Sequence, residues 1–329
     1  MEGEVHPYER LTPEYVLDAV EAAGFECDGR MLALNSYENR VYQVGLEDST
    51  PVIAKFYRPG RWKPEAIIEE HEFAAELAEL EIPVVAPMML NPFDATVGEH
   101  EGFSFAVYPR RPGRWPDLET RTDRELLGRF IGRMHACGGI RPFSERIRLN
   151  VETFGHLPLA DLEQCESVPS EIRNNVLVAA RVLLEAISLR LDAYPSRNIR
   201  LHGDFHLGNV LWSDHGPHIV DLDDCCTGPA VQDLWMLLSG NRDERQGQLS
   251  DVLRGYEEFA YVDYSELAII EALRGLRMVR YNGWLAARWE DPAFQKAFPW
   301  FTTPRYWEEQ IVNLREQLEM LDEPPLSVI

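Results

Sequence analysis

The segment between residues 199 and 222 constrains the fold of this chain more than any other. It contains three short apolar runs, I-R-L, N-V-L-W and H-I-V-D-L, separated by turn residues such as Gly216 and Pro217. The rest of the chain after about residue 117 shows apolar residues at helical spacing instead. A few short strands inside a helical region predict a rigid frame, and functional side chains gather on the loops of such frames.

The loop H-G-D-F-H-L-G-N lies in this frame. It places Asp204 two residues after His202 and five residues before Asn209, which is the spacing of a kinase catalytic loop. Phosphoryl transfer needs a carboxylate that orients the attacking hydroxyl and accepts its proton, and a carbonyl oxygen that helps to hold magnesium on the phosphates. We therefore predict Asp204 as the catalytic carboxylate and Asn209 as a magnesium ligand.

Asp221 follows Asn209 by twelve residues, at the end of the run H-I-V-D-L. Its carboxylate would be the stronger metal ligand, so Asp221 joins Asp204 in the predicted catalytic machinery. Mg²⁺ prefers oxygen ligands and keeps several waters, so two protein ligands and the phosphates of ATP suffice. The alternative is an ordinary turn with a hydrogen-bonding asparagine, which the flanking strands and the spacing of Asp221 disfavour.

Before residue 107 the pattern is that of a small antiparallel sheet interrupted by one helix. Pro64 opens a helical stretch that ends near Leu80, and proline is well tolerated in a first helical turn. Strand-like runs rich in β-branched and aromatic residues cover 34–44, 51–57 and 103–108.

The segment Y-P-R-R-P-G-R-W-P at 108–116 contains three prolines and one glycine, so it predicts an irregular connector. After it, helical spacing of apolar residues recurs over 123–136, 171–193, 229–239, 265–289 and 304–321. We therefore predict an α+β, bilobal, protein-kinase-like fold with ATP between the lobes. Its parts are a small β-rich N-terminal lobe at 1–107, a hinge at 108–116 whose backbone binds adenine, and a larger helical C-terminal lobe at 117–329.

Lysine is rare in this chain, because only three of its 32 basic residues are lysines. Lys55 lies in the apolar run V-I-A-K-F, on the same strand face as Ile53, where its ammonium could reach the α- and β-phosphates of ATP. Glu70 lies on the apolar face of the helix that Pro64 opens, so it is the predicted partner of Lys55, with Glu69 as the alternative. A solvated edge-strand lysine is the other interpretation of Lys55.

The phosphate-binding loop has no familiar glycine pattern. Neither G-x-G-x-x-G nor G-x-x-x-x-G-K-[ST] occurs, so neither a Rossmann site nor a P-loop is supported. The turn N-S-Y-E-N at 35–39 is the remaining candidate, because the side chains of Ser36 and Asn39 can donate hydrogen bonds to phosphate oxygens. The same residues also make ordinary turns.

The charge balance excludes some classes of function. The chain has 55 acidic and 32 basic residues and a net charge of −23, which argues against a nucleic-acid-binding surface or a polybasic membrane patch. No apolar run approaches the ~18 residues of a membrane span, and the start M-E-G-E-V-H-P lacks a signal segment. The five irregularly spaced cysteines indicate free thiols in a reducing compartment. We expect a cytoplasmic protein.

With these residues in place, the chain resembles the aminoglycoside phosphotransferase and choline kinase superfamily, and much more closely the bacterial stress response kinase A group. The likeness covers nearly the whole chain and includes the segments L-N-S-Y-E-N-R-V-Y-Q-V, K-F-Y-R-P, R-L-H-G-D-F-H-L-G-N-V-L-W, V-D-L-D-D, G-P-A-V-Q-D-L-W-M-L-L and E-P-P-L. It implies that Asp204 is the catalytic aspartate, that Asn209 and Asp221 bind magnesium, and that Ser36 lies at the ATP site. It also implies serine and threonine acceptors on proteins, the kinase itself included.

Three alternatives to a protein kinase remain. The catalytic loop does not encode the acceptor, so the first is a small-molecule kinase that acts on an amino alcohol or an aminosugar. The second, of another class, is a hydrolase that binds zinc through the side chains of His202, His206, His215 and Asp221. The third is a catalytically inactive nucleotide-binding module, although all of the expected catalytic residues are present.

Overall fold

The computed structural model describes residues 7–214 and 216–328, and these residues form two compact units. The first unit takes the N-terminal part of the chain and two later segments, and the second takes the remainder. The described residues of the first unit come from Met1–Asp117, Ser144–Arg146 and His206–Cys225, and those of the second from Leu118–Phe143, Ile147–Phe205 and Cys226–Ile329. The chain therefore returns twice to the N-terminal unit.

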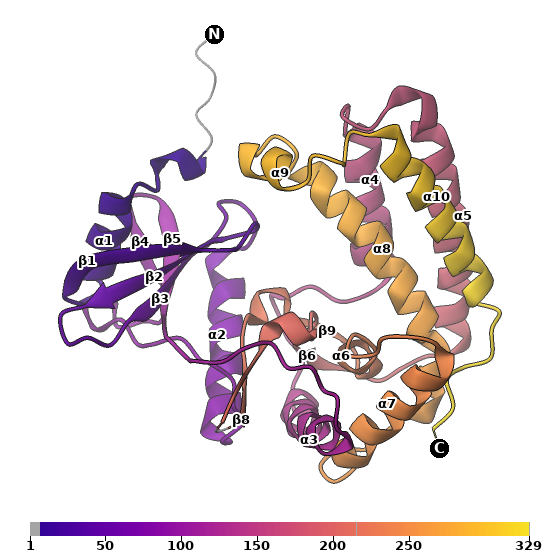
Figure 1. Cartoon of the computed structure of the whole chain (residues 1–329), viewed down its shortest axis with the longest axis horizontal. Helices are drawn as coiled ribbons and strands as arrows, with labels where there is room; N and C mark the ends of the chain where they lie inside the picture. The colour runs from indigo at the N-terminus through magenta and orange to yellow at the C-terminus, as the bar shows by residue number, and fades with distance from the viewer. Residues whose placement is uncertain (1–6, 215, 329) are drawn as a thin grey trace. The chain divides into compact units, whose positions relative to one another are not determined.

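A five-stranded antiparallel sheet forms the centre of the first unit, with the strand order β1-β2-β3-β5-β4 (Figure 1). The strands are β1 (Cys27–Leu34), β2 (Arg40–Leu46), β3 (Val52–Phe56), β4 (Gly98–His100) and β5 (Phe103–Pro109). The helical elements are η1 (Pro7–Arg10), α1 (Pro13–Ala22), α2 (Pro64–Glu79) and η2 (Asn91–Phe93). The run predicted over 34–44 is the end of β1, a turn at 35–39 and most of β2.

The two faces of this sheet pack against different helices. Ala54 and Phe56 of β3 lie in the core cluster that includes residues of α1. Because side chains alternate along a strand, Lys55 projects from the opposite face. Lys55 pairs in register with Ala106 of β5, and Ala106 belongs to a smaller cluster with Ile67 of α2. The strand period therefore brings Lys55 to the face that α2 covers.

Local sequence signals set the starts of these helices. The Thr12 hydroxyl accepts a hydrogen bond from the Tyr15 amide at 3.3 Å, and Pro13 occupies the first turn of α1. Pro64 likewise occupies the first turn of α2, as predicted, but no side chain caps the start of that helix. Helix α1 has no counterpart among the predicted helices, although its capping threonine and the following proline are a helix-start signal.

The strands predicted between residues 199 and 222 are present, but they divide between the two units. The first unit holds η4 (Leu207–Asn209), the hairpin of β7 (Val210–Ser213) and β8 (Gly216–Ile219), and η5 (Leu222–Asp224). In the second unit β6 (Asn198–Leu201) pairs with β9 (Cys226–Pro229). The catalytic-loop segment follows β6 directly.

Helices make up most of the second unit, where α4, α5 and α10 pack against α8, and α3 packs against α7 (Figure 1). Its helical elements are α3 (Arg121–Gly138), η3 (Glu152–His156), α4 (Leu157–Gln164), α5 (Ser170–Ala193), α6 (Val231–Trp235), α7 (Arg242–Tyr256), η6 (Tyr264–Ile269), α8 (Ile270–Ala287), α9 (Pro292–Ala297) and α10 (Pro304–Met320). The predicted α+β class, β-rich first and helical later, is confirmed. Over the described part of the chain, no helix has the length and apolar character needed to cross a membrane.

The region after β9 differs most from the sequence prediction. The helix predicted over 229–239 is the short α6, and α7 has no predicted counterpart because its sequence is polar and shows little helical periodicity. A capping box between Asn241 and Glu244 starts α7. A Cβ atom at Gly128 of α3 would lie 2.0 Å from the Val252 carbonyl oxygen, so the close approach of α3 to α7 requires glycine.

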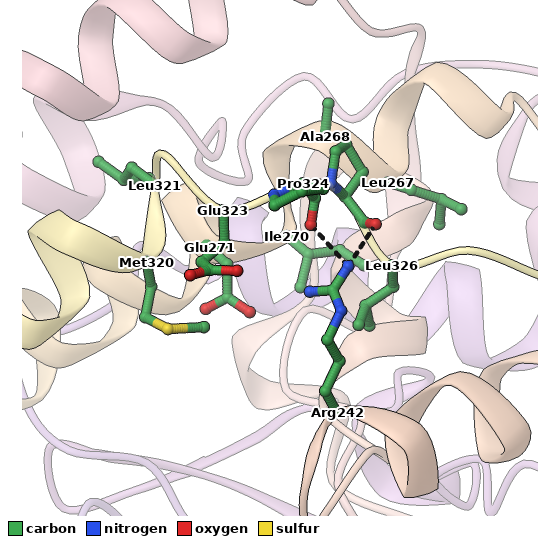
Figure 2. A pocket seen from close by; sticks show the side chains of 11 residues that line it. Arg242, Leu267, Ala268, Ile270, Glu271, Met320, Leu321, Glu323, Pro324 and Leu326 are labelled. Carbon is green, nitrogen blue, oxygen red and sulfur yellow. Dashed lines mark hydrogen bonds between the residues drawn. The ribbon is translucent and has the colours of Figure 1, made fainter.

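Helix α7 also holds the end of the chain on the second unit. Arg242 donates from Nη2 to the carbonyl oxygens of Pro324 and Pro325, both at 2.8 Å, as Figure 2 shows. Leu326 is buried, and it lines a small pocket together with Leu267 of η6. The segment E-P-P-L therefore packs against this unit.

Candidate active site

Lys55 is the centre of a buried cluster of charges in the first unit. Its Nζ lies 3.1 Å from Oδ1 of Asp221 and 3.2 Å from Oδ1 of Asp223, which belong to the chain around η5. It lies 3.7 Å from Oε1 of Glu70 on α2. Lys55 is only 6% exposed, and β3 lies between β2 and β5. The interpretation of Lys55 as a solvated edge-strand lysine is therefore wrong.

The electrostatics of this cluster keep Lys55 and Asp223 charged. Burial alone would lower the pKa of Lys55, but its three carboxylate neighbours raise it well above the ordinary value. Burial would raise the pKa of Asp223, but Arg61 and Lys55 hold it below the usual range. Lys55 is thus a fixed, desolvated cation at neutral pH, which suits the binding of phosphate oxygens.

Glu70 and Glu69 have different roles in the structure. Glu70 lies between two cations, with Oε2 3.6 Å from Nη1 of Arg146. Glu69 instead accepts backbone hydrogen bonds from Ser144 at 2.5 Å, Glu145 at 2.8 Å and Arg146 at 2.9 Å. The structure therefore brings Glu70 to Lys55, whereas Glu69 holds the 144–146 segment against α2.

Arg61 is a member of the cluster that sequence reasoning does not identify. Its guanidinium pairs with Oδ2 of Asp223 through Nη1 and donates from Nη2 to Oδ1 of Asp224 at 2.8 Å. The Arg61 side chain is 10% exposed and the Asp223 side chain 5% exposed. The Asp223 carboxylate therefore forms ion pairs with two cations, Lys55 and Arg61. It is largely inaccessible to solvent.

Asp221 and Asn209, the two predicted metal ligands, are joined by the β7–β8 hairpin. The amide of Val220 donates to the Asn209 carbonyl oxygen at 3.0 Å, which places Asp221 one residue from that bond. Asp221 has φ 63°, a left-handed conformation that is rare outside glycine, asparagine and aspartate. Its side chain is 54% exposed, so a bound cation could reach the carboxylate. Strained backbone of this kind is common at ligand sites.

The two residues predicted to bind phosphate from the turn at 35–39 differ in burial. Ser36 is half-buried in the turn at 35–39. Asn39 is 4% exposed, and its Oδ1 accepts a hydrogen bond from the amide of Arg58 at 3.1 Å. The Asn39 side chain thus fastens the turn to the chain that follows β3.

Asp204 lies in the second unit, in the loop after β6. Its Oδ1 accepts a hydrogen bond from Nη1 of Arg277 on α8, and its side chain is 23% exposed. The preceding Gly203 has φ 83°, which glycine adopts without steric cost. A sharp turn at Gly203 therefore presents the Asp204 carboxylate at the end of the strand.

Asp233 anchors this turn through the backbone. Its carboxylate accepts hydrogen bonds from the amides of His202 and Gly203, both at 2.9 Å, and it is fully buried. His135 bridges two polar groups beside this anchor. Its ring nitrogens lie 3.0 Å from Oδ2 of Asp233 and 3.0 Å from the hydroxyl of Tyr256. Helices α3, α6 and α7 thus jointly support the loop.

The zinc-hydrolase alternative finds no support in the described residues. His206 uses Nδ1 to accept a hydrogen bond from the Gly208 amide at 3.0 Å, and His202 is fully buried. His215, the third histidine of that alternative, lies outside the described residues. Among the residues that are described, no group of three or more His, Cys, Asp and Glu side chains is arranged to hold a metal ion.

Known proteins with similar sequences identify the family. The model of the phosphotransferase enzyme family matches residues 31–270. Stress response kinase A of Escherichia coli (strain K12) is 42% identical over 328 residues, covering 100% of this chain and 99% of that protein. The serine/threonine protein kinase RdoA of Salmonella typhimurium (strain LT2) is 42% identical over 330 residues with the same coverage. The chain belongs to the stress response kinase A family.

The fold comparison agrees with this membership. The amicoumacin kinase hAmiN, solved with AMP-PNP, Ca²⁺ and Ami, superposes with a TM-score of 0.72 at 20% identity, over 94% of this chain and 93% of that one. At this identity the likeness shows the fold alone. The predicted kinase, and its bilobal kinase-like fold of the aminoglycoside phosphotransferase type, are confirmed.

The pKa of Glu70 predicts how the stability of the kinase depends on pH. Burial raises this pKa from 4.5 to about 7, against the lowering effect of Lys55 and Arg146. The folded kinase therefore binds the proton more tightly than the unfolded chain does, a contribution that is complete below about pH 4.5 and lost as the pH rises through about 7. Relative to Glu70→Gln, the wild type should lose about 1–3 kcal/mol of unfolding free energy between about pH 5 and 8.

Denaturant unfolding of both proteins across this pH range measures the effect. Glu79→Gln, at an exposed position of the same helix, is the matched control and should follow the wild type. A difference between the wild type and Glu70→Gln that stays constant with pH would contradict the prediction.

Proposed function

We propose that this kinase transfers the γ-phosphoryl group of ATP, with Mg²⁺, to serine or threonine side chains of proteins, its own included. The observation that carries the proposal is the buried Lys55, which lies 3.7 Å from Glu70 and 3.1 Å from Asp221. In protein kinases a strand lysine of this kind pairs with a helix glutamate and binds the α- and β-phosphates, while a neighbouring aspartate binds the metal.

The residues around Asp221 have the chemistry that a magnesium site needs. Mg²⁺ takes hard oxygen ligands, and Asp221 and Asn209 offer a carboxylate and an amide oxygen from one hairpin. Asp223 is not a candidate ligand, because Lys55 and Arg61 occupy its carboxylate. A bound magnesium ion would neutralise charge on the ATP phosphates. Lys55 would add a second, permanent positive charge beside them.

Asp204 would orient the acceptor hydroxyl and accept its proton. This role is supported by the spacing of the loop and by its rigid support, since Asp233 binds two consecutive backbone amides next to Asp204. A loop backbone held in this way needs little reorganisation at Asp204 when the acceptor binds.

The remaining assignments concern ATP. The turn at 35–39, with Ser36 as a donor and Asn39 as its structural anchor, would cover the phosphates. The connector at 108–116 would separate an N-terminal lobe at 1–107 from a C-terminal lobe at 117–329 and bind adenine through its backbone. None of the five cysteines forms a disulfide bond in the structure, which is consistent with the reducing cytoplasm as the site of action.

The choice of a protein acceptor is supported by the name of a close relative. RdoA, 42% identical over the whole chain, is named a serine/threonine protein kinase. The net charge of −23 adds an expectation that the phosphorylated segments are basic or neutral.

A labelling experiment tests the proposal. The purified kinase is incubated with γ-labelled ATP and Mg²⁺, alone, with a generic basic protein, and with choline, homoserine or an aminoglycoside. We expect label on serine or threonine of the kinase and of the added protein, and none after chelation of the metal. Label on a small molecule alone would refute the protein acceptor and leave phosphoryl transfer standing.

A further inference from the structure

Arg277 is a basic residue that contacts the proposed catalytic carboxylate, Asp204. It projects from α8, and its Nη1 donates to Oδ1 of Asp204. The two residues are separated by 73 positions in the sequence, so the contact depends on the fold. The Arg277 side chain is 44% exposed and the Asp204 side chain 23% exposed. The pair is therefore accessible to solvent on one side.

Different elements hold the backbone and the side chain of the catalytic loop. Asp233 of α6 binds the amides of His202 and Gly203, and Gln232 donates from Nε2 to the Gly203 carbonyl oxygen at 3.1 Å. These contacts fix the peptide groups before Asp204, but they do not fix the orientation of its carboxylate. Arg277 contacts that carboxylate directly, so α6 holds the backbone while α8 directs the side chain.

We propose that Arg277 is a positioning residue for phosphoryl transfer, an inference that rests on the proposed role of Asp204. A guanidinium that binds one carboxylate oxygen restricts rotation of the side chain. The carboxylate then meets the acceptor hydroxyl in one orientation, which saves the cost of ordering it in the transition state. In a chain with a net charge of −23, a cation at this position also offsets the repulsion that an additional carboxylate feels.

The proposal predicts that removal of Arg277 lowers activity without lowering stability. A half-exposed ion pair contributes little to the stability of a folded protein, so removal of Arg277 should leave folding nearly unchanged. Because Arg277 acts through Asp204 and not on ATP, its loss should lower kcat and leave the KM for ATP almost unchanged. Loss of a purely structural surface contact would change neither kcat nor the KM for ATP.

Arg277→Ala, Arg277→Lys and Asp204→Asn, with the double variant Arg277→Ala/Asp204→Asn, form the test. Steady-state labelling at varied ATP concentration gives kcat and KM for each protein, and thermal unfolding gives its midpoint. The matched control is Arg305→Ala, which removes another exposed arginine that pairs with a helix carboxylate, Glu309, at 3.0 Å.

We expect Arg277→Ala to lower kcat about tenfold and change the KM for ATP by less than about threefold, with Arg277→Lys intermediate and Arg305→Ala like the wild type. On the Asp204→Asn background the same substitution should change the residual rate by less than about threefold, because the group that it positions is already disabled.

Three results would overturn the proposal. A kcat for Arg277→Ala within about twofold of the wild type would show that the carboxylate needs no support. A further tenfold loss on the Asp204→Asn background would show that Arg277 acts on another group. A drop of more than about 5 °C in the unfolding midpoint of both Arg277 variants would show a structural role. If instead Asp204→Asn itself retains full activity, the proposed role of Asp204 fails, and the inference about Arg277 fails with it.

Discussion

Asp204→Asn should lower phosphotransfer at saturating ATP by a factor on the order of 100 or more. An asparagine keeps the shape of the side chain and an oxygen for Arg277, but it cannot accept the proton of the acceptor hydroxyl. Lys55 and Asp221, which would bind Mg-ATP, belong to the other compact unit, so their contacts are not altered by this change. ATP affinity and the thermal unfolding midpoint should therefore stay close to the wild-type values.

Single-turnover labelling measures the rate, and calorimetry with Mg-ATP measures the affinity. Asp192→Asn, at an exposed position of α5, is the control for loss of one negative charge in the same unit and should retain full activity. Asp204→Asn activity within a few-fold of wild type would remove Asp204 from the mechanism.

The parts of this structure that could be predicted from the sequence are those whose signal is local. The period of two along β3 puts Lys55 on the face opposite Ala54, and the helical period of α2 points Glu70 toward the sheet. The two periods together bring Lys55 and Glu70 within 3.7 Å of each other. The catalytic-loop spacing is equally local, since Asn209 follows His202 by only seven positions.

The parts that could not be predicted depend on pairings between distant segments. Arg61 reaches Asp223 across 162 residues and Arg277 reaches Asp204 across 73, and no local pattern distinguishes these arginines from others in the chain. Glu69 was a possible partner of Lys55 because it neighbours Glu70, but the amides of residues 144–146 satisfy it. Such contacts are set by the three-dimensional packing of elements that sequence periodicity describes one at a time.

The same packing separates the roles of two aspartates that look alike in the segment V-D-L-D-D. Asp223 is 4% exposed and pairs with Lys55 and Arg61. Removing its charge would leave two buried cations with fewer partners, which costs about 3–5 kcal/mol for a buried pair. The Asp221 side chain is 54% exposed. If the Asp221 charge were removed, Lys55 would still pair with Asp223 and Glu70. The structure therefore makes Asp223 the stabilising residue and leaves Asp221 accessible to a ligand.

Asp221→Asn should accordingly weaken the binding of Mg-ATP by a factor on the order of 100 and lower the unfolding midpoint only slightly. Asparagine is the appropriate replacement, because it tolerates the left-handed backbone at φ 63°, whereas alanine there would add strain. Calorimetric titration of Mg-ATP into each variant measures the affinity, and titration of ATP with the metal chelated gives the contribution that depends on magnesium.

Asp223→Asn is the comparison that makes this result specific to Asp221. Both variants remove one negative charge near Lys55, so a general electrostatic effect on ATP binding would appear in both. If Asp221 is the metal ligand, the ATP affinity of Asp221→Asn should no longer depend on magnesium, and this variant should remain stable. Asp223→Asn should instead be less stable, and the ATP affinity of its folded molecules should still depend on magnesium. Unchanged Mg-ATP affinity in Asp221→Asn would exclude Asp221 as a metal ligand, and the half-exposed carboxylate would then serve only to hold Lys55 in place.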